Sequence, residues 1–484
     1  MSTSRVNTLQ RFRNETFDVL VVGGGIVGAG VARDAAQRGL TVALVDRHDF
    51  AFGTSSRSSR LLHGGLRYLE QGHIKLVREA SREKTILRDI APNLGEPLGF
   101  VFPAYRRNGR PLWQLKIGVR LYDLLCNGKN FGRSRGLTRH ETLQLLPGLD
   151  TAGLLGSVQY YDALTNDSRL VIDTLRSAAQ HGAAVCNYVR FLKADHQGPW
   201  ACSLRDESSG EVITVRARTV VNATGPWAPE IERSQVKLRL SKGIHLVLEK
   251  KRLGITAPLV LAEGSRILFV IPWGERVIIG TTDTDYTGRP EDVAVDPNDV
   301  EYVLNAVNMS FPTLKLSESD VISTWAGVRP LIADPNGAPS DISRAHEIHT
   351  PEPGWWDVAG GKLTTYRLMA EHTVDQLCRH LGGGRLRCRT AATPLLSASD
   401  RRFSSVVPPP ITREAVAHYV LKEWALTVED VMIRRSSWGL YHSAALARTD
   451  EVAGWIAQLL AGNAKEEARG NVDGIRPAFP TAFE

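Results

Sequence analysis

The sequence predicts an α/β protein with a first domain of strands alternating with helices, a second domain built on a mixed or antiparallel sheet, and a small C-terminal α-helical cap. Three observations lead to this fold class. Near the start, an apolar strand runs into closely spaced glycines and then into a helical pattern. Between about 243 and 282, apolar residues alternate as in antiparallel strands. From Val452 to Leu460, apolar residues recur at the spacing of one helix face.

Composition places the chain among ordinary globular proteins. Its 484 residues are enough for two or three domains, with 43% hydrophobic and 23% charged residues. The net charge of +7 makes an anionic partner worth seeking. Five dispersed cysteines without C-x-x-C spacing argue against a disulfide framework and suit a reducing cytosol. We find no segment typical of a signal peptide or a spanning helix, so we expect a cytoplasmic protein whose membrane contact is peripheral.

The first motif combines a strand, closely spaced glycines and a helix. Residues 17–22 form an apolar strand, glycines follow at G-x-G-x-x-G spacing, and a helical pattern runs from Ile26 to about Arg38. These glycines allow a tight turn, the approach of a pyrophosphate and close packing of the helix on the strand. The next strand, residues 41–45, ends at a carboxylate suited to a ribose. The unit predicts a Rossmann-type dinucleotide site in which the helix N-terminus faces the phosphates, formed by Gly23, Gly25, Ile26, Val27, Gly28 and Asp46.

A second motif, residues 53–68, is too rich in Ser, Gly and Arg for a plain core element. Its hydroxyl and backbone N–H groups suit the lining of a phosphate or flavin site, whereas the alternative is a flexible surface loop. The doubled glycine beside His63 favours the functional interpretation.

Two charged stretches follow. Residues 74–90 alternate in charge sign around apolar positions, which predicts a solvated amphipathic helix. Residues 105–135 carry eight basic side chains against Asp123 alone, so they hold an excess equal to that of the whole chain. Because Trp113 and several leucines are interleaved with these cations, the stretch fits a helix at an anionic lipid surface. A basic helix packed on the protein's own core is an equally good interpretation.

Later segments supply the second sheet and the ligand-facing loops. Residues 218–227 predict a strand ending in a Gly-Pro turn, which in a doubly wound sheet reaches the ligand edge. Residues 267–271 and 276–280 predict a hairpin. We therefore divide the chain into four parts. A discontinuous nucleotide-binding domain comprises 1–104, 150–235 and 320–388, and a sheet-based substrate domain comprises 236–319. A basic amphipathic insertion spans 105–149, and a C-terminal cap and tail span 389–484.

Five segments occur in the order found in one protein family: residues 23–28, 54–68, 222–227, 327–331 and 360–367. Each alone is shared with other flavin oxidoreductases. Together with the short motifs at Gly243 and Gly280, they are specific. The chain resembles the FAD-dependent glycerol-3-phosphate dehydrogenases of the aerobic, respiratory kind, densely over about residues 17–375 and loosely in the cap.

The resemblance implies a glutathione-reductase-like FAD domain and oxidation of sn-glycerol 3-phosphate to dihydroxyacetone phosphate. The hydride would pass to FAD N5 and the electrons to a membrane quinone, or in some branches to oxygen. It further implies attachment at the inner face of the cell membrane. Besides the glycine motif, the FAD-binding residues that it implies are Thr54, Ser55, Ser58, His63, Gly64, Gly65, Val189, Ala223, Thr224, Gly225, Trp227, Gly327, Arg329, Gly361, Lys362, Leu363 and Thr364.

The chain departs from the family at three points. Asp46 stands where Glu is frequent, which keeps the carboxylate. Arg60 stands where Lys is expected, which keeps the charge but not the shape. The cap is shortened, so formation of a homodimer through it stays open.

Oxidation of an alcohol needs a base for the hydroxyl proton, and a neutral imidazole suits this role near pH 7. The resemblance places His63 and His245 near the flavin, and we predict His245 as the base with His63 as second candidate. Arg329 and Lys362 are predicted to bind the anionic substrate, assisted by His63 and more weakly by Arg57. Arg329 is also suited to polarising the developing carbonyl.

Two further expectations concern charge and metal. A helix starting at 361–364 would offer N–H groups to the negative charge of reduced flavin. Asp283 and Asp285 follow a hairpin and are interpreted as turn caps rather than as a carboxylate pair. No His, Cys or carboxylate cluster has metal-ligand spacing, so we predict no metal.

Three alternatives are weighed against this function. A soluble FAD-dependent amino-acid or hydroxy-acid oxidase would need a carboxylate-binding Arg but no second cation for phosphate. A nucleic-acid-binding flavoprotein would use residues 105–135 on phosphates, but the interleaved Trp and Leu favour lipid and no nucleic-acid motif is present, so we expect no nucleic-acid partner. A non-catalytic FAD-bound scaffold would not need both histidines and both cations.

Overall fold

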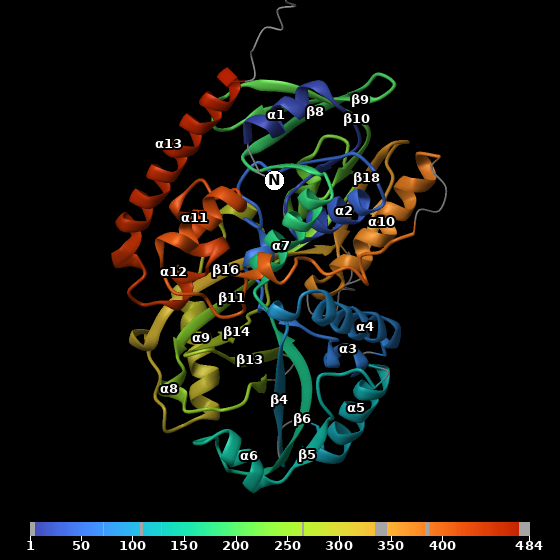
Figure 1. Cartoon of the computed structure of the whole chain (residues 1–484). Helices are drawn as coiled ribbons and strands as arrows, with labels where there is room; N and C mark the ends of the chain where they lie inside the picture. Colours follow the sequence, from blue (N-terminus) through green and yellow to red (C-terminus); the bar gives the residue numbers. More distant parts are fainter. Residues whose placement is uncertain are drawn as a thin grey trace, which may run out of the picture.

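We analysed a computed structural model of the chain, which describes residues 5–70, 72–106, 110–126, 128–263, 266–333, 346–382 and 387–473. Two sheets, the helices that cover them and a C-terminal cap make up the fold (Figure 1). Within these described ranges, no helix has the length and apolar character needed to cross a membrane. All five cysteines are free thiols.

The first sheet contains eight strands and has a parallel centre, in the order β17-β18-β10-β1-β2-β7, and β9 pairs with β10 and β8 with β9. Residues 17–22 and 41–45 were predicted as strands around a helix, and this unit is confirmed. The strands are β1 (Thr16–Val22), β2 (Val42–Val45), β7 (Ala184–Cys186), β8 (Val189–His196), β9 (Trp200–Asp206), β10 (Val212–Asn222), β17 (His346–His349) and β18 (Trp355–Gly360).

Both faces of the parallel centre are covered, which explains why its strands are continuous apolar runs. On one face, Val19 and Val21 pack against α2 (Ile26–Gln37), α7 (Asp167–Gln180) and α10 (Tyr366–His380). On the other face, Leu20 packs with Phe12 of α1 (Arg5–Asn14) and with Trp200 of β9. β1 thus ends inside the molecule, and the glycine motif follows directly at its carboxyl end.

The second sheet has ten strands, and most of its neighbouring strands are antiparallel. The predicted hairpin is confirmed as β13 and β14, which pair with Ile271 opposite Ile278. The strand order of the second sheet is β15-β11-β14-β13-β12-β4-β6-β3, with β16 beside β11 and β5 beside β6. The strands are β3 (Leu61–Leu62), β4 (Glu96–Tyr105), β5 (Arg135–Leu137), β6 (Leu154–Leu164), β11 (Leu238–Glu249), β12 (Leu259–Glu263), β13 (Arg266–Trp273), β14 (Arg276–Gly280), β15 (Thr284–Tyr286) and β16 (Val321–Ile332).

The sheet pairing differs from the predicted division of the chain at four strands of the second sheet, β3, β4, β6 and β16. β4 and β6 fall in ranges assigned to the nucleotide-binding domain, yet they pair with each other and β4 joins β12 of the second sheet, Val101 opposite Leu259. An apolar strand carries no local signal for which sheet it joins, because the partner is distant in sequence. The domain boundaries themselves stay a prediction.

The predicted basic insertion connects β4 to β6 and contains α5 (Leu112–Leu125) and α6 (Arg139–Leu145). One face of α5 packs into the core through Leu115, Val119 and Tyr122, while Trp113 and Leu124 are 65% and 71% exposed. α5 therefore packs on the core, as one interpretation expects, and also opens an apolar stripe to water, whereas its contact with lipid stays a prediction. Arg107, part of the basic stretch, lies outside the described residues.

α4 (Ile74–Ile90) has the predicted bounds but not the predicted environment. Glu83 is 1% and Lys84 0% exposed. Glu83 forms an ion pair of 2.6 Å with Arg367 of α10, and Lys84 one of 2.8 Å with Asp162 of β6. The prediction of a solvated amphipathic helix is therefore wrong for Glu83 and Lys84, because α4 packs against two neighbouring elements and these two charges face inward to buried partners. The short α3 (Leu66–Glu70) precedes α4.

The predicted cap is present, with its own buried cluster around Val452 and Ile456 of α13 (Thr449–Asp473). Its other helical segments are α11 (Arg413–Lys422), the π-helical turn η8 (Asp430–Arg435) and α12 (Trp438–Tyr441). Arg435 fastens the cap to the first sheet through an ion pair of 2.7 Å with Asp49. Although burial opposes ionisation, this cation and Arg434 hold the pKa of Asp49 at about 2. The predicted fold class is confirmed; α8 (Lys250–Leu253) and α9 (Pro297–Ser310) complete the substrate side.

Candidate active site

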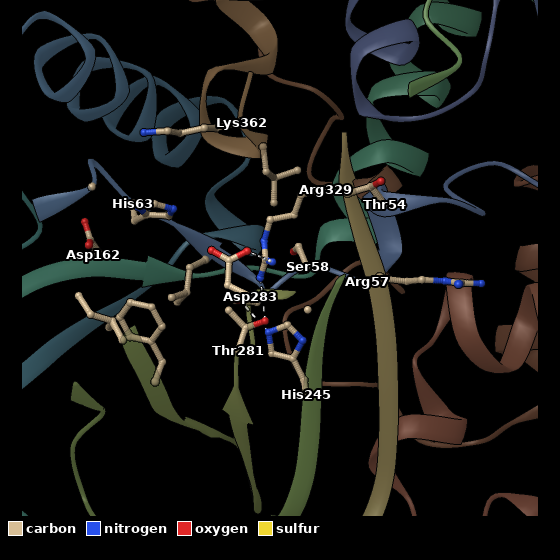
Figure 2. A pocket seen from close by; sticks show the side chains of 18 of the residues that line it. Thr54, Arg57, Ser58, His63, Asp162, His245, Thr281, Asp283, Arg329 and Lys362 are labelled. Atoms are coloured by element: carbon tan, nitrogen blue, oxygen red, sulfur yellow. Dashed lines mark hydrogen bonds and ion pairs between the residues drawn. The ribbon is translucent and has the colours of Figure 1, made fainter. Parts of the chain in front are cut away.

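A cavity of about 500 Å³ is lined by strands of the second sheet, the start of α2, the 54–68 block and the loop after β18 of the first sheet. Figure 2 shows side chains from distant parts of the chain around it. The predicted residues that line it are Ile26, Thr54, Ser55, Arg57, Ser58, His63, Gly65, His245, Gly327, Arg329, Gly361, Lys362 and Leu363. The predicted residues outside this lining are Gly23, Gly25, Val27, Gly28, Asp46, Gly64, Val189, Ala223, Thr224, Gly225, Trp227 and Thr364.

The glycine motif turns as predicted between β1 and α2. Gly23 has a φ of +110°, which favours glycine. A side chain at Gly28 would clash with the carbonyl oxygen of Gly23, whereas one at Gly25 would approach only Ser55 Oγ, at 3.2 Å. Gly25 thus borders the most open side of the motif, next to the N-terminus of α2. This geometry fits a pyrophosphate close to the backbone.

Asp46 lies at the end of β2, where the sequence predicts a ribose-binding carboxylate. Its two carboxylate oxygens accept hydrogen bonds from the backbone N–H groups of Gly24, at 2.7 Å, and His48, at 2.9 Å. Burial raises its pKa to about 6. The Val189 N–H donates to the Asp46 carbonyl at 2.7 Å, so both predicted residues sit at one place.

The loop after β10 is held mainly by contacts within the protein. Thr224 Oγ1 donates to Asn222 at 2.7 Å. Trp227 Nε1 donates to Glu291 at 2.9 Å, and the Arg47 guanidinium lies 4.9 Å from the Trp227 ring centre. Thr224 and Trp227 therefore already have polar partners, and the cofactor roles predicted in this loop stay predictions.

His245 projects from β11 and is 2% exposed. Its Nε2 is hydrogen-bonded to Ser59 Oγ at 2.8 Å, and its ring stacks on Trp325 of β16, with ring centres 4.9 Å apart and planes 18° apart. Burial, together with the nearby cations Arg329 and Arg60, lowers the pKa of His245 to about 3. The imidazole is therefore uncharged at neutral pH, as a proton acceptor must be.

Arg329 projects from β16 toward the same part of the cavity (Figure 2). Its guanidinium donates to Thr281 Oγ1 at 2.8 Å and pairs with Asp283 at 3.2 Å. The interpretation of Asp283 as a turn cap is wrong, since its carboxylate lines the cavity and faces a cation from another strand. Asp285, in contrast, pairs with Arg239 at 2.6 Å on the surface.

The loop between β18 and α10 brings Lys362 into the cavity lining. Its Nζ lies 3.6 Å from the centre of the Tyr68 ring. A short 3-10 turn (Leu363–Thr365) opens directly into α10, so the predicted helix start is present. The His63 N–H donates to Thr364 Oγ1 at 3.1 Å, which ties the 54–68 block to this loop.

Arg57 points elsewhere. In Figure 2 its side chain extends away from Arg329 and His245. It also lines a second cavity, of about 300 Å³, together with Arg434 of the cap. Burial and Arg434 lower the pKa of Arg57. The predicted substrate cations are therefore not all brought together, because Arg57 is separated from Arg329.

Several lining residues were not predicted as site residues: Ser59, Tyr68, Phe100, Phe102, Tyr160, Asp162, Phe269, Thr281 and Asp283. One had a signal in the sequence, because Asp162 is the only charged residue in β6. Such a residue inside a strand needs a buried partner, which here is Lys84. The aromatic lining residues had no such signal in the sequence, since an aromatic strand residue is most often part of a core. In the described part of the chain, no group of three or more His, Cys, Asp or Glu side chains could hold a metal ion.

Comparisons with known proteins agree on one family. Residues 18–376 match the model of the FAD dependent oxidoreductase family. A glycerol-3-phosphate dehydrogenase of Mycobacterium leprae is 41% identical over 77% of this chain, and an aerobic glycerol-3-phosphate dehydrogenase of Staphylococcus epidermidis is 38% identical over 77%. The matches span 64% and 69% of those relatives, so the chain covers less than two thirds of the mycobacterial protein.

Among solved structures, a glycerol-3-phosphate dehydrogenase from Bacillus halodurans in complex with FAD superposes with a TM-score of 0.77. It is 27% identical, and the match covers 99% of this chain and all of that one. A glycine oxidase from Geobacillus kaustophilus, 21% identical with a TM-score of 0.58, covers 76% of this chain and 95% of its own, and shares the fold.

Proposed function

This chain belongs to the FAD-dependent oxidoreductases, within them to the glycerol-3-phosphate dehydrogenases, and from this premise we propose that it oxidises sn-glycerol 3-phosphate to dihydroxyacetone phosphate. The observation that carries the proposal is the grouping of a buried neutral imidazole, His245, with two cations, Arg329 and Lys362, around one cavity. A phosphorylated alcohol needs both kinds of group: a base for its hydroxyl and positive charge for its phosphate.

The residues present fit FAD, the cofactor of this family. Gly25 borders the open side of the glycine motif, where a side chain would intrude, and the N-terminus of α2 begins beside it. Residues of the 54–68 block and of the loop before α10 line the adjoining 500 Å³ cavity. When bound, FAD would supply the acceptor for the hydride of the alcohol, which carries the two electrons.

In the proposed reaction, the protein holds the phosphate and receives a proton. Arg329 and Lys362 bind the phosphate by charge-assisted hydrogen bonds, and His245 takes the proton of the hydroxyl group. Arg329 is also suited to stabilising the oxygen as it becomes a carbonyl. Asp283 fixes the Arg329 guanidinium in position by its ion pair. His63 is the second candidate for the base and for substrate binding, and Arg57 the weaker substrate cation.

We further propose that the electrons pass to a quinone in the membrane, with the protein attached to the inner face of the cell membrane. Support comes from the α5 surface, which we define as the exposed apolar and basic residues of α5 and its flanks. The apolar members recur along one stripe and have cations beside them, as at a lipid headgroup layer. They are Trp113, Ile117, Leu121 and Leu124, with Arg106, Lys116, Arg120, Lys129, Arg133 and Arg135.

The proposal is tested by anaerobic titration of the purified protein with sn-glycerol 3-phosphate, followed at the flavin absorbance. We expect full bleaching, no bleaching with glycerol, and none with D-amino acids. Bleaching by a D-amino acid but not by glycerol 3-phosphate would establish the amino-acid oxidase instead. Arg329→Lys should need roughly tenfold more substrate, because Lys cannot reproduce the two-pronged guanidinium.

A further inference from the structure

His245, the proposed base, has no nitrogen that opens freely into the cavity. Its side chain is 2% exposed. Nδ1 is buried and has no hydrogen-bond partner among the described residues. Nε2 is the nitrogen that has a partner, and that partner is Ser59 Oγ, at 2.8 Å. The Ser59 hydroxyl is therefore the polar group through which a proton from the cavity can reach Nε2.

Ser59 itself lines the cavity, in the block between the glycine motif and β3. The pair is held in a shared frame. Trp325 stacks on the His245 ring at 4.9 Å and donates from Nε1 to the Ser58 carbonyl at 3.2 Å. One side chain thus fixes both the plane of the imidazole and the backbone next to Ser59. The pair is preorganised, as proton transfer between fixed groups requires.

We propose, building on the proposed function, that Ser59 is a further catalytic residue, which relays the proton of the substrate hydroxyl to Nε2 of His245. The O–H bond of the substrate breaks as a new O–H bond forms on Ser59 Oγ. The original Ser59 O–H bond breaks as an N–H bond forms at Nε2. In this arrangement His245 carries its resting proton on Nδ1 and becomes imidazolium. The two electrons leave the substrate carbon as hydride, and the oxidant is the FAD of the proposed function.

The charges around the pair link this relay to the presence of substrate. Arg329 and Arg60 both lower the pKa of His245, after burial. Arg60 is 1% exposed, and its guanidinium lies 5.4 Å from the Trp325 ring centre, on which His245 also stacks. A phosphate bound at Arg329 offsets part of this positive field, so it raises the proton affinity of the imidazole. The base becomes competent when the substrate is in place.

The first test measures anaerobic flavin reduction by sn-glycerol 3-phosphate in stopped flow. Ser59→Ala and His245→Ala should each slow reduction by roughly 10²- to 10⁴-fold, and substrate affinity should stay within about threefold of the wild type. Because the two residues act as a unit, the double variant should be no slower than the slower single variant. Ser59→Thr, which keeps a hydroxyl, should recover much of the rate. Ser56→Ala, a matched loss of a hydroxyl in the same block, should reduce at the wild-type rate.

The second test does not depend on turnover. The ¹⁵N signals of the His245 imidazole, in protein labelled at histidine, report the hydrogen bond at Nε2 and the pKa. We expect Ser59→Ala to shift the Nε2 signal and inorganic phosphate to raise the pKa of His245 in the wild type. Three results would each overturn the relay. The first is a rate of flavin reduction in Ser59→Ala within threefold of the wild type. The others are rate losses that multiply in the double variant and an Nε2 signal that Ser59→Ala leaves unchanged. Wild-type flavin that glycerol 3-phosphate does not reduce would instead overturn the proposed function, and the ¹⁵N signals would still decide whether the pair exists.

Discussion

Helices α4 and α5 pack against each other, yet they present opposite chemistry to water. α4 carries alternating charges, and two of them, Glu83 and Lys84, are fully buried in ion pairs. α5 leaves large apolar side chains exposed, among them Trp113 at 65% and Leu124 at 71%. Two charged residues of α4 are thus part of the interior, whereas apolar residues of α5 are part of the surface.

This difference shows that the environment of a side chain is decided by the neighbouring elements rather than by helix composition. α4 packs on both β6 and α10, and each supplies a counter-ion to a charge that faces inward. α5 packs on the second sheet with one face, and the large apolar residues on its other face, Trp113, Ile117, Leu121 and Leu124, are exposed. A buried charge with a partner is a structural feature, whereas an exposed apolar stripe marks a surface that contacts something else.

The largest expected effect is the loss of a buried charge in α4. Lys84→Met leaves the Asp162 carboxylate without its cation at 5% exposure, and should lower the free energy of unfolding by about 3–5 kcal/mol. Chemical denaturation followed by tryptophan fluorescence measures this. Lys75→Met is the matched control on the same helix, since Lys75 is 92% exposed, and should change the free energy by less than about 0.5 kcal/mol. Equal effects of both variants would mean that Lys84 is not a buried partner in solution.

The next largest effect is expected at the apolar stripe of α5. The double variant Trp113→Ser/Leu124→Ser should leave the unfolding free energy within about 0.5 kcal/mol of the wild type, since both side chains are exposed. Its affinity for anionic lipid vesicles should fall at least about 100-fold, because each side chain loses roughly 1.5 kcal/mol of burial. Co-sedimentation with vesicles measures the affinity. Unchanged vesicle binding would place the docking surface elsewhere.

The smallest effect concerns single cations on the same surface. Lys116→Gln should weaken vesicle binding by about 1 kcal/mol, or roughly fivefold, and the difference from the wild type should shrink as salt is raised. Titration with vesicles at two salt concentrations measures it. Flavin reduction by glycerol 3-phosphate in solution should stay at the wild-type rate, since Lys116 is exposed and outside the cavity lining. A variant whose vesicle binding is weakened equally at all salt concentrations would contradict an electrostatic origin.

The parts of the fold that the sequence predicts are those with local signals. The glycine motif sits between an apolar strand and a helix, so β1, α2 and β2 follow from about 30 consecutive residues. The pairing of β4 with β12 had no such signal, because the partners lie more than 150 residues apart. The helical stripe in α13 was likewise a local pattern, and it faces the cap core as predicted.

The candidate site follows the same rule. His245 and Arg329 were found from motifs that the chain shares with a family, and both line the cavity. Asp283 was misread because its partner, Arg329, comes from another strand, and short-range spacing suggested a turn instead. Ser59 was passed over among several serines of one block, since only the fold decides which of them meets His245.

The contacts of Tyr122 have a consequence for how this protein can diverge. Tyr122 lies on the buried face of α5, and its hydroxyl accepts the Gly64 N–H at 2.8 Å and donates to Asp162 at 2.6 Å. A side chain at Gly64 would clash with that hydroxyl. Tyr122 on the inner face of α5 is therefore constrained by its contacts with the loop beside His63, whereas the residues of the outer stripe are exposed to solvent. Single substitutions on the outer stripe can therefore change the surface that we propose contacts lipid without disturbing the contacts around Gly64.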